Sequence, residues 1–208
     1  MNKYIIGVVG GSGAGKTTFI KSLRNLFSKG EICILSQDNY YLAREKQHKD
    51  SNGVINFDLP SAIDQKKMLS DIDDLVHDKE IIQMEYGYSK NDTKIKQNVL
   101  IPAPIIVIEG LYIFWFKKIY PLLDFKIFID TKDNLKLIRR INRDGTERNE
   151  PISEVLYRYE NHVLPSYEAH VHPFKEKADI IINNNEGFEN ALEFVKNSIR
   201  YKYLQTKM

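Results

Sequence analysis

The sequence is short of the features that mark several protein classes. It has one cysteine, Cys33, among 208 residues, so no disulfide can form within the chain. No stretch reaches the roughly 18 uncharged apolar residues that a membrane-spanning helix needs, and the apolar stretch at the N-terminus is too short for a signal peptide. We therefore expect a cytoplasmic protein without a membrane partner.

An excess of charge of one sign is also missing. Lys and Arg number 30 against 28 Asp and Glu, a formal net charge of +2, and the two signs are interspersed. Proteins that bind nucleic acids concentrate basic residues on one face, so we expect no nucleic-acid partner. Hydrophobic residues make up 42% of the sequence, which suffices for one core, and the length predicts a single domain over residues 1–208.

Short runs rich in β-branched residues alternate with longer amphipathic segments. The runs predict strands over residues 4–9, 32–35, 105–108, 125–129 and 180–182. The amphipathic segments predict helices over residues 16–27, 62–75, 132–144, 152–170 and 188–203. This alternation is typical of an α/β fold with a doubly wound, mostly parallel sheet.

Three other stretches interrupt or flank this pattern. Polar and apolar residues alternate over 80–86 and 94–101, which predicts a β-hairpin inserted over about 80–101 at the carboxyl edge of the sheet, where ligands of such folds bind. The polar residues 44–52 are expected to form a loop. The apolar stretch 110–116 predicts core packing, with a homo-oligomer contact as the alternative.

A phosphate-binding motif follows the first predicted strand. Residues 10–17 read GGSGAGKT and match G-x-x-x-x-G-K-[ST], directly before a predicted helix. The backbone N–H groups of such a loop and the helix N-terminus surround phosphates, while Lys16 would reach the β- and γ-phosphates and Thr17 would offer its hydroxyl to Mg²⁺. The motif predicts a nucleotide-binding P-loop protein and does not by itself establish kinase chemistry.

Carboxylates follow two of the predicted strands. Asp38 comes three residues after the strand ending at residue 35, and we expect it to accept the proton of an acceptor hydroxyl, with a turn or helix cap as the alternative. Glu109 closes the strand over 105–108 and is followed by Gly110, an arrangement expected of a carboxylate that binds Mg²⁺. Asp130 also ends a strand, but capping of the next helix explains it.

Four arginines lie within ten residues: Arg139, Arg140, Arg143 and Arg148. On a helix their side chains could converge on one anion, and a movable lid of arginines could neutralise a transferring phosphoryl group. The segment of about 139–151 therefore predicts an arginine-rich lid. The alternative is a solvated helix face with ion pairs such as Asp144 to Arg148.

These motifs together resemble the uridine kinase family, within the wider group that includes phosphoribulokinases and bacterial pantothenate kinases. The resemblance runs from about Tyr4 to Asn183 and is carried by GGSGAGKTT, LSQDNYY, FDLPSAID, EYGY, VIEGLY, LIRRINRDGTER and ADIIINN. It implies a P-loop kinase fold, ATP as phosphate donor and Mg²⁺ as cofactor. The implied acceptor is a small-molecule hydroxyl, above all the 5′-hydroxyl of uridine or cytidine.

The resemblance also implies roles for individual residues. The ATP phosphates would lie on Gly11, Ser12, Gly13, Ala14, Gly15, Lys16, Thr17 and Thr18. Magnesium would lie near Thr17, Asp38 and Glu109, and the catalytic set would be Asp38, Lys16, Arg143 and Arg148. Acceptor contacts would come from Asp38, Tyr41, Asp58, Tyr86, Asn91 and Arg140, of which Asp58 and Arg140 would hold ribose hydroxyls.

Three positions depart from the family pattern at the side that would hold the base. Asn91 stands nearest to a histidine that uridine and cytidine kinases typically carry in the hairpin. Glu150 replaces the second arginine of an Arg-Gly-Arg sequence, and Arg158 stands where a glutamine is expected. The sequence therefore specifies the reaction better than it specifies the acceptor. It also does not decide between ATP and GTP as the donor.

Two alternatives stay open. The first is a kinase of the same fold that acts on another small alcohol, such as pantothenate, a ribosyl compound or a sugar phosphate, as the three departures allow. The second is a nucleotide-binding switch that hydrolyses NTP slowly, because both classes share the phosphate loop. The absence of an Asn-Lys-x-Asp guanine motif and the presence of the hairpin argue against the switch.

Overall fold

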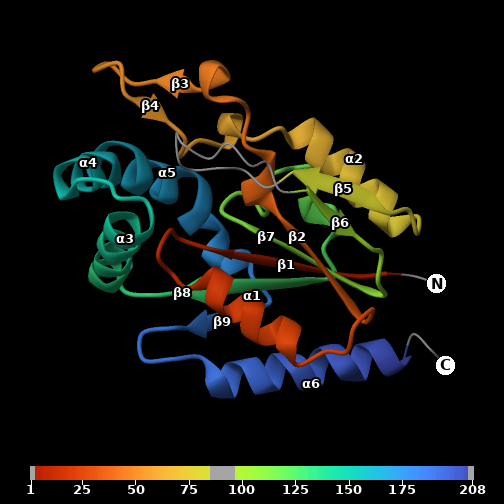
Figure 1. Ribbon diagram of the computed structural model, residues 1–208. Coiled ribbons are helices and arrows are strands. Elements are labelled where there is room, and N and C mark those ends of the chain that lie inside the picture. The colour runs from red at the N-terminus through yellow and green to blue at the C-terminus, as the bar shows by residue number, and fades with distance from the viewer. Residues whose placement is uncertain (1–2, 85–96, 206–208) are drawn as a thin grey trace.

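A computed structural model describes residues 3–84 and 97–205 of the chain. Five parallel strands form the central sheet in the order β2-β7-β1-β8-β9. Their bounds are β1 Tyr4–Gly10, β2 Ile32–Ser36, β7 Ile105–Gly110, β8 Phe125–Asp130 and β9 Ile180–Asn183. All five predicted strands are present, and the prediction of a doubly wound parallel sheet is confirmed (Figure 1).

Helices cover both faces of the sheet. The helices of the chain are α1 Lys16–Asn25, α2 Gln65–Val76, α3 Asp133–Glu147, α4 Ile152–Arg158, α5 Leu164–Ser166 and α6 Glu189–Gln205. Figure 1 shows α1 and α6 below the sheet and α2 above it. Each face has its own apolar cluster, one including Phe19, Leu23 and Val195, the other including Met68, Ile72 and Phe114. Burial of both faces explains why the strands are continuously apolar rather than alternating.

The predicted helices differ from the structure by up to three residues at an end, and one of them is interrupted. The helix predicted from residue 62 begins at Gln65, because the Asp64 side chain accepts a hydrogen bond from the N–H of Lys67 and caps it. The helix predicted over 152–170 is interrupted by π turns at Tyr159–Val163 and Tyr167–Val171 on either side of α5. Pro165 lies in α5 and lacks the N–H of a regular helical hydrogen bond, which is a common cause of such breaks.

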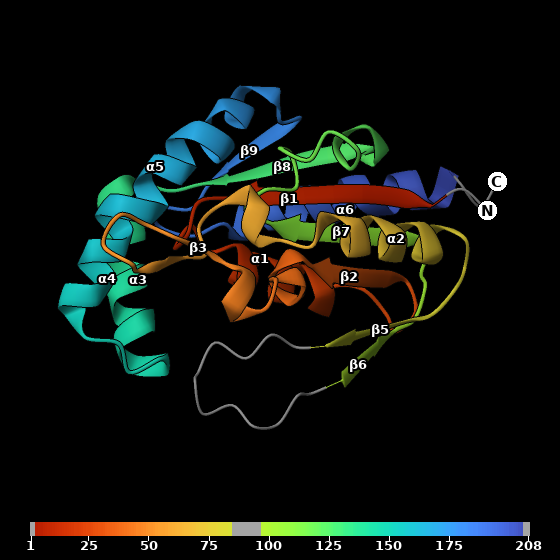
Figure 2. The ribbon, with the colours of Figure 1, turned by 90° about the horizontal axis from the view of Figure 1, so that it is seen from above.

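Two small antiparallel pairs flank the central sheet. β5 Ile81–Met84 pairs with β6 Gln97–Leu100, as the predicted hairpin requires, and Figure 2 shows the pair beside β2. Gln83 Nε2 donates to the carbonyl oxygen of Ser36 at 3.3 Å, which fixes β5 near the carboxyl end of β2. The second pair, β3 His48–Lys49 with β4 Ile55–Asn56, lies partly in the expected loop and was not predicted.

The apolar stretch 110–116 contributes mainly to the core, as predicted. Tyr112, Ile113, Phe114 and Phe116 are almost fully buried, whereas Trp115 is 39% exposed. Across residues 3–84 and 97–205, no helix is long and apolar enough to cross a membrane.

Candidate functional site

The phosphate loop has the backbone conformation that its glycines permit. Gly13 and Gly15 adopt φ angles of +80° and +94°, in the left-handed region that favours glycine. A Cβ atom at Gly13 would lie 2.3 Å from the carbonyl oxygen of Lys136, which leaves no room for a side chain. Gly15 directly precedes α1, so the loop opens onto the positive end of that helix.

Side chains from two other strand ends hold the loop in place. The carbonyl oxygen of Ala14 accepts hydrogen bonds from Asn184 Nδ2 at 2.8 Å and from Thr131 Oγ1 at 3.1 Å. Thr131 follows β8 and Asn184 follows β9, so three neighbouring strands fix the loop together. Sequence reasoning did not assign these two residues, because their polar atoms meet Ala14 only in the fold.

The side chain of Lys16 folds back onto the phosphate loop. Its ammonium donates to the carbonyl oxygens of Gly10 at 2.9 Å and Gly11 at 3.1 Å. Burial lowers the pKa of Lys16, while the nearby carboxylates of Glu109 and Asp38 act in the opposite direction. The three charged groups are therefore close enough to influence one another, as a shared phosphate site requires.

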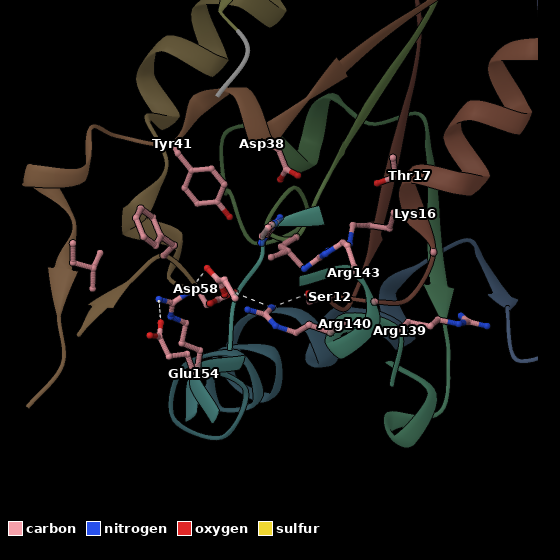
Figure 3. A pocket seen from close by; sticks show the side chains of 18 of the residues that line it. Ser12, Lys16, Thr17, Asp38, Tyr41, Asp58, Arg139, Arg140, Arg143 and Glu154 are labelled. Carbon is pink, nitrogen blue, oxygen red and sulfur yellow. Dashed lines mark hydrogen bonds and ion pairs between the residues drawn. The ribbon is translucent and has the colours of Figure 1, made fainter. Parts of the chain in front are cut away.

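Glu109 and Asp38 meet through Ser36. The register pairs Ser36 at the end of β2 with Glu109 on β7, and the Ser36 hydroxyl donates to Glu109 Oε1. The Ser36 oxygen also accepts the N–H of Asp38 at 3.3 Å, so Ser36 rather than Asp38 caps the short turn Gln37–Tyr40. Figure 3 shows the Asp38 carboxylate directed toward the space beside Lys16 and Thr17. The alternative of Asp38 as a cap is therefore not what the structure shows.

The environment of Glu109 favours binding of a cation. The residue is only 8% exposed. Burial and, to a smaller extent, the charge of Asp38 raise the pKa of Glu109 to about 7, although the hydrogen bond from Ser36 and the charge of Lys16 act in the opposite direction. A buried carboxylate beside a second carboxylate carries more negative charge than its surroundings stabilise, and a divalent cation would supply that stabilisation.

These groups line one cavity of about 870 Å³, of a size that small-molecule sites commonly have. The cavity is lined by these residues from the predicted set: Ser12, Gly13, Gly15, Lys16, Thr17, Thr18, Asp38, Tyr41, Asp58, Glu109, Arg140, Arg143 and Arg148. Gly11 and Ala14, which are also expected to bind ATP, are buried and do not line this cavity, and the Ala14 N–H donates to the Gly11 carbonyl oxygen at 3.1 Å. Tyr86 and Asn91 lie outside the described residues.

The arginine-rich helix α3 is organised around Asp144. This carboxylate is fully buried and lies 2.8 Å from Arg143 Nε, 3.2 Å from Arg140 Nε and 3.3 Å from Arg148 Nη1. Arg140 Nη1 also donates to the Ser12 hydroxyl at 2.9 Å and lies 4.0 Å from Asp58 Oδ1. Sequence reasoning considered Asp144 only as a partner of Arg148 on a solvated face. The fold instead makes it the common anchor of three arginines.

Arg139 differs from the other arginines of α3. Its guanidinium donates to the carbonyl oxygen of Asn184 at 3.0 Å, and Figure 3 shows it directed away from Arg140. Arg139 also lines the cavity, but its guanidinium does not join the other three arginines at Asp144. Arg139 supports the phosphate loop from the side of β9.

The far end of the cavity combines aromatic rings with charged groups. Tyr41 and Phe57 pack edge to face with ring centroids 6.1 Å apart. Burial raises the pKa of Asp58, and the positive charge of Arg140 is the largest contribution in the opposite direction. Glu150 and Arg158, which both depart from the family pattern, form an ion pair that the sequence does not indicate. Arg158 Nη1 contacts Glu150 Oε1 at 2.6 Å, and Arg158 Nη2 contacts Glu154 Oε2 at 3.1 Å.

Asp130 does not cap α3, contrary to expectation. Its carboxylate accepts a hydrogen bond from Lys175 Nζ at 2.7 Å, and α3 begins after Lys132 without a side-chain cap. Asp130 does not line the cavity.

Comparison with known proteins agrees with this geometry. The Phosphoribulokinase / Uridine kinase family matches residues 5–188. A uridine kinase of Limosilactobacillus reuteri is 34% identical over 198 residues, covering 94% of this chain and 90% of the relative. A uridine-cytidine kinase A of Dictyostelium discoideum is 33% identical over 97% of this chain, although the match spans only 40% of that longer relative.

Solved structures of low identity support the fold alone. A D-glycerate 3-kinase from Cryptococcus neoformans superposes with a TM-score of 0.58 and 14% identity, covering 88% of this chain and 86% of the other. The fold that carries these site residues is thus shared with solved kinases. The family model also covers almost the whole sequence. The chain belongs to the phosphoribulokinase/uridine kinase family and is a P-loop kinase.

Proposed function

We propose that this kinase transfers the γ-phosphate of ATP, with Mg²⁺, to the 5′-hydroxyl of uridine or cytidine. The observation that carries the proposal is the convergence of Lys16, Asp38 and Glu109 on one cavity with the acceptor-side residue Asp58. The names and coverage of the uridine kinase relatives support the choice of acceptor.

The donor half of the cavity suits a metal-bound triphosphate. Thr17, Asp38 and Glu109 supply oxygen atoms, the ligands that Mg²⁺ prefers. When bound, Mg²⁺ neutralises charge on the β- and γ-phosphate oxygens. Lys16 and the N-terminus of α1 stabilise the same phosphates from the loop.

The acceptor hydroxyl is activated by Asp38 in this proposal. Asp38 accepts the hydroxyl proton as the acceptor oxygen attacks the γ-phosphorus and the bond to the β-phosphate oxygen breaks. Arg143 and Arg148, anchored by Asp144, stabilise the negative charge on the transferring group. Asp58 and Arg140 bind the ribose hydroxyls, and Tyr41 packs against the nucleoside. Tyr86 and Asn91 are proposed to complete that pocket.

The charge at the acceptor end favours an uncharged acceptor. Glu150, Glu154 and Arg158 form one cluster with two carboxylates and one guanidinium, which carries one net negative charge. This cluster would repel an anionic acceptor such as a sugar phosphate or pantothenate. The alternative of an anionic alcohol is favoured by Arg44, which also lines the cavity and lies over Phe57.

A panel of acceptors scored by ADP release tests the proposal. Uridine and cytidine should stimulate ADP release in the presence of Mg²⁺ and ATP, whereas pantothenate, glycerate and ribose 5-phosphate should not. Removal of Mg²⁺ with EDTA should abolish the stimulation. If uridine and cytidine at millimolar concentration give no stimulation, the nucleoside acceptor is refuted. If no acceptor stimulates the slow basal hydrolysis, the nucleotide-switch alternative is favoured instead.

The pairing of Glu150 with Arg158 predicts an energetic coupling between them. Glu150→Gln and Arg158→Gln should each raise KM for the nucleoside by about three- to tenfold, and the double variant should cost less than the product of the two. Steady-state kinetics on the four proteins of this cycle measures the coupling. Asp74→Asn on α2, which breaks the exposed pair with Lys79 beyond the end of that helix, is the matched control. Fully multiplicative effects would show that the pair does not act as one unit.

A further inference from the structure

A partly buried cluster of hydrogen bonds joins the β3–β4 ribbon to the helices that border the cavity. One oxygen of Asp50, Oδ2, contacts Tyr157 Oη at 2.8 Å and His162 Nε2 at 2.7 Å. Asp50 directly follows β3, Tyr157 lies on α4, and His162 lies on the following π turn. We call Asp50, Tyr157 and His162 the ribbon clasp.

The direction of these hydrogen bonds follows from the state of Asp50. Burial alone would raise the pKa of Asp50, but hydrogen bonds from His162, from Tyr157 and from the backbone N–H groups of Val54 and Asn52 lower it to about 2. Asp50 is therefore ionised at neutral pH and accepts all four bonds. The His162 ring must carry a proton on Nε2, and it is held rigidly because the side chain is only 1% exposed.

The clasp is the link between two segments that supply cavity residues. Four residues beyond Val54, the ribbon places Asp58 in the cavity, and Phe57 stands beside it. The helix on the other side of the clasp carries Glu154 and Arg158, which also line the cavity. Figure 1 shows the ribbon and α4 at the same end of the molecule.

The ribbon has little stability of its own. Each of its strands has two residues, and both residues of β3 are exposed. Such a short antiparallel pair is at most marginally stable in isolation. At the base of the ribbon, Gln47 Nε2 donates to the carbonyl oxygens of Leu42 and Ala62. The tip is joined to the helices by the hydrogen bonds of Asp50 with Tyr157 and His162, and by Asn52 Nδ2, which donates to Tyr157 Oη at 2.7 Å.

We propose that Asp50, Tyr157 and His162 are positioning residues for the acceptor: the clasp fixes Phe57 and Asp58 on the ribbon against Arg158 on the helix, and so sets the width of the acceptor end of the cavity. The proposal rests on the proposed function for the identity of the acceptor. It assigns no contact between the clasp and the phosphates, so ATP binding should not depend on it.

Kinetics with uridine and ATP separates positioning from a general structural role. His162→Phe keeps an aromatic ring but removes the donor to Asp50, and KM for uridine should rise on the order of tenfold while KM for ATP changes less than twofold. His162→Gln can place an amide N–H near the position of Nε2 and should restore most of the lost affinity. His77→Phe, on the exposed end of α2, should leave both KM values unchanged.

Amide hydrogen exchange gives a readout that does not depend on the acceptor. In His162→Phe the amides of Asn52, Val54 and Asp58 should exchange faster than in the unaltered protein, while those of α1 should not. If no nucleoside is turned over by the unaltered protein, the proposed function fails, yet this arm still tests the clasp. Unchanged exchange in the ribbon, or a loss of uridine and ATP affinity in equal measure, would overturn the proposal.

Discussion

Asp38→Asn is expected to lower turnover by a factor on the order of a hundred or more while ATP binding stays nearly intact. Asparagine keeps the shape of the side chain but cannot accept a proton from the acceptor hydroxyl. Asp38 lies on the short turn after β2, directed toward the space beside Lys16 and Thr17 (Figure 3). Its own N–H is bonded to Ser36, so the substitution should leave the turn in place.

A matched control exists at the same edge of the sheet. Asp130 ends β8, is bound to Lys175 and does not line the cavity, so Asp130→Asn should change kcat by less than threefold. Single-turnover kinetics and calorimetric titration of ATP would separate chemistry from binding. Equal turnover by Asp38→Asn and the unaltered protein would remove Asp38 from the role of base.

Asp144→Asn should produce the largest change in stability. The carboxylate is fully buried among Arg140, Arg143 and Arg148, and its loss leaves three positive charges without their common counterion. Breaking a buried ion pair from one side typically costs about 3–5 kcal/mol. Turnover should fall as well, because Arg143 and Arg148 would lose the anchor that directs them toward the transferring phosphoryl group.

Asp74→Asn on α2 is the control for Asp144→Asn. Asp74 forms an exposed ion pair with Lys79, so its removal should have little effect on unfolding. Chemical denaturation measures the difference in free energy between the variants. If Asp144→Asn proves too unstable to assay, Arg148→Gln tests the same anchor from its more exposed side and should lower kcat with a smaller loss of stability. A stable and fully active Asp144→Asn would contradict the anchoring role.

The central sheet and the phosphate loop could be predicted because their signals are local. A strand buried on both faces requires a continuous apolar run, and a loop that closes around phosphates requires glycines at fixed spacing. The strand over 105–108 and the motif over 10–17 needed no knowledge of distant residues. The single-domain organisation and the catalytic roles of the site residues stay predictions.

The supports of the site could not be predicted in the same way. Asn184 bonds to Ala14, 170 residues earlier, and His162 bonds to Asp50 across 112 residues. In neither pair does the spacing or the local composition of the sequence indicate which residue will be the partner. The π turns around Pro165 also decide which side of the helix faces the ribbon, a rotation that a regular period of 3.6 residues does not reveal.

By itself, the sequence determined that this protein has a parallel α/β sheet, a phosphate loop after its first strand, and carboxylates at the carboxyl ends of two further strands. Only the tertiary structure decided that Asp144 gathers three arginines, that Glu150 and Arg158 compensate each other, and that the ribbon is fastened to the helices beside the cavity. The physical reason is that backbone conformation and burial follow from neighbouring residues, whereas the partner of a buried charge depends on which distant segments the packing brings within hydrogen-bond distance.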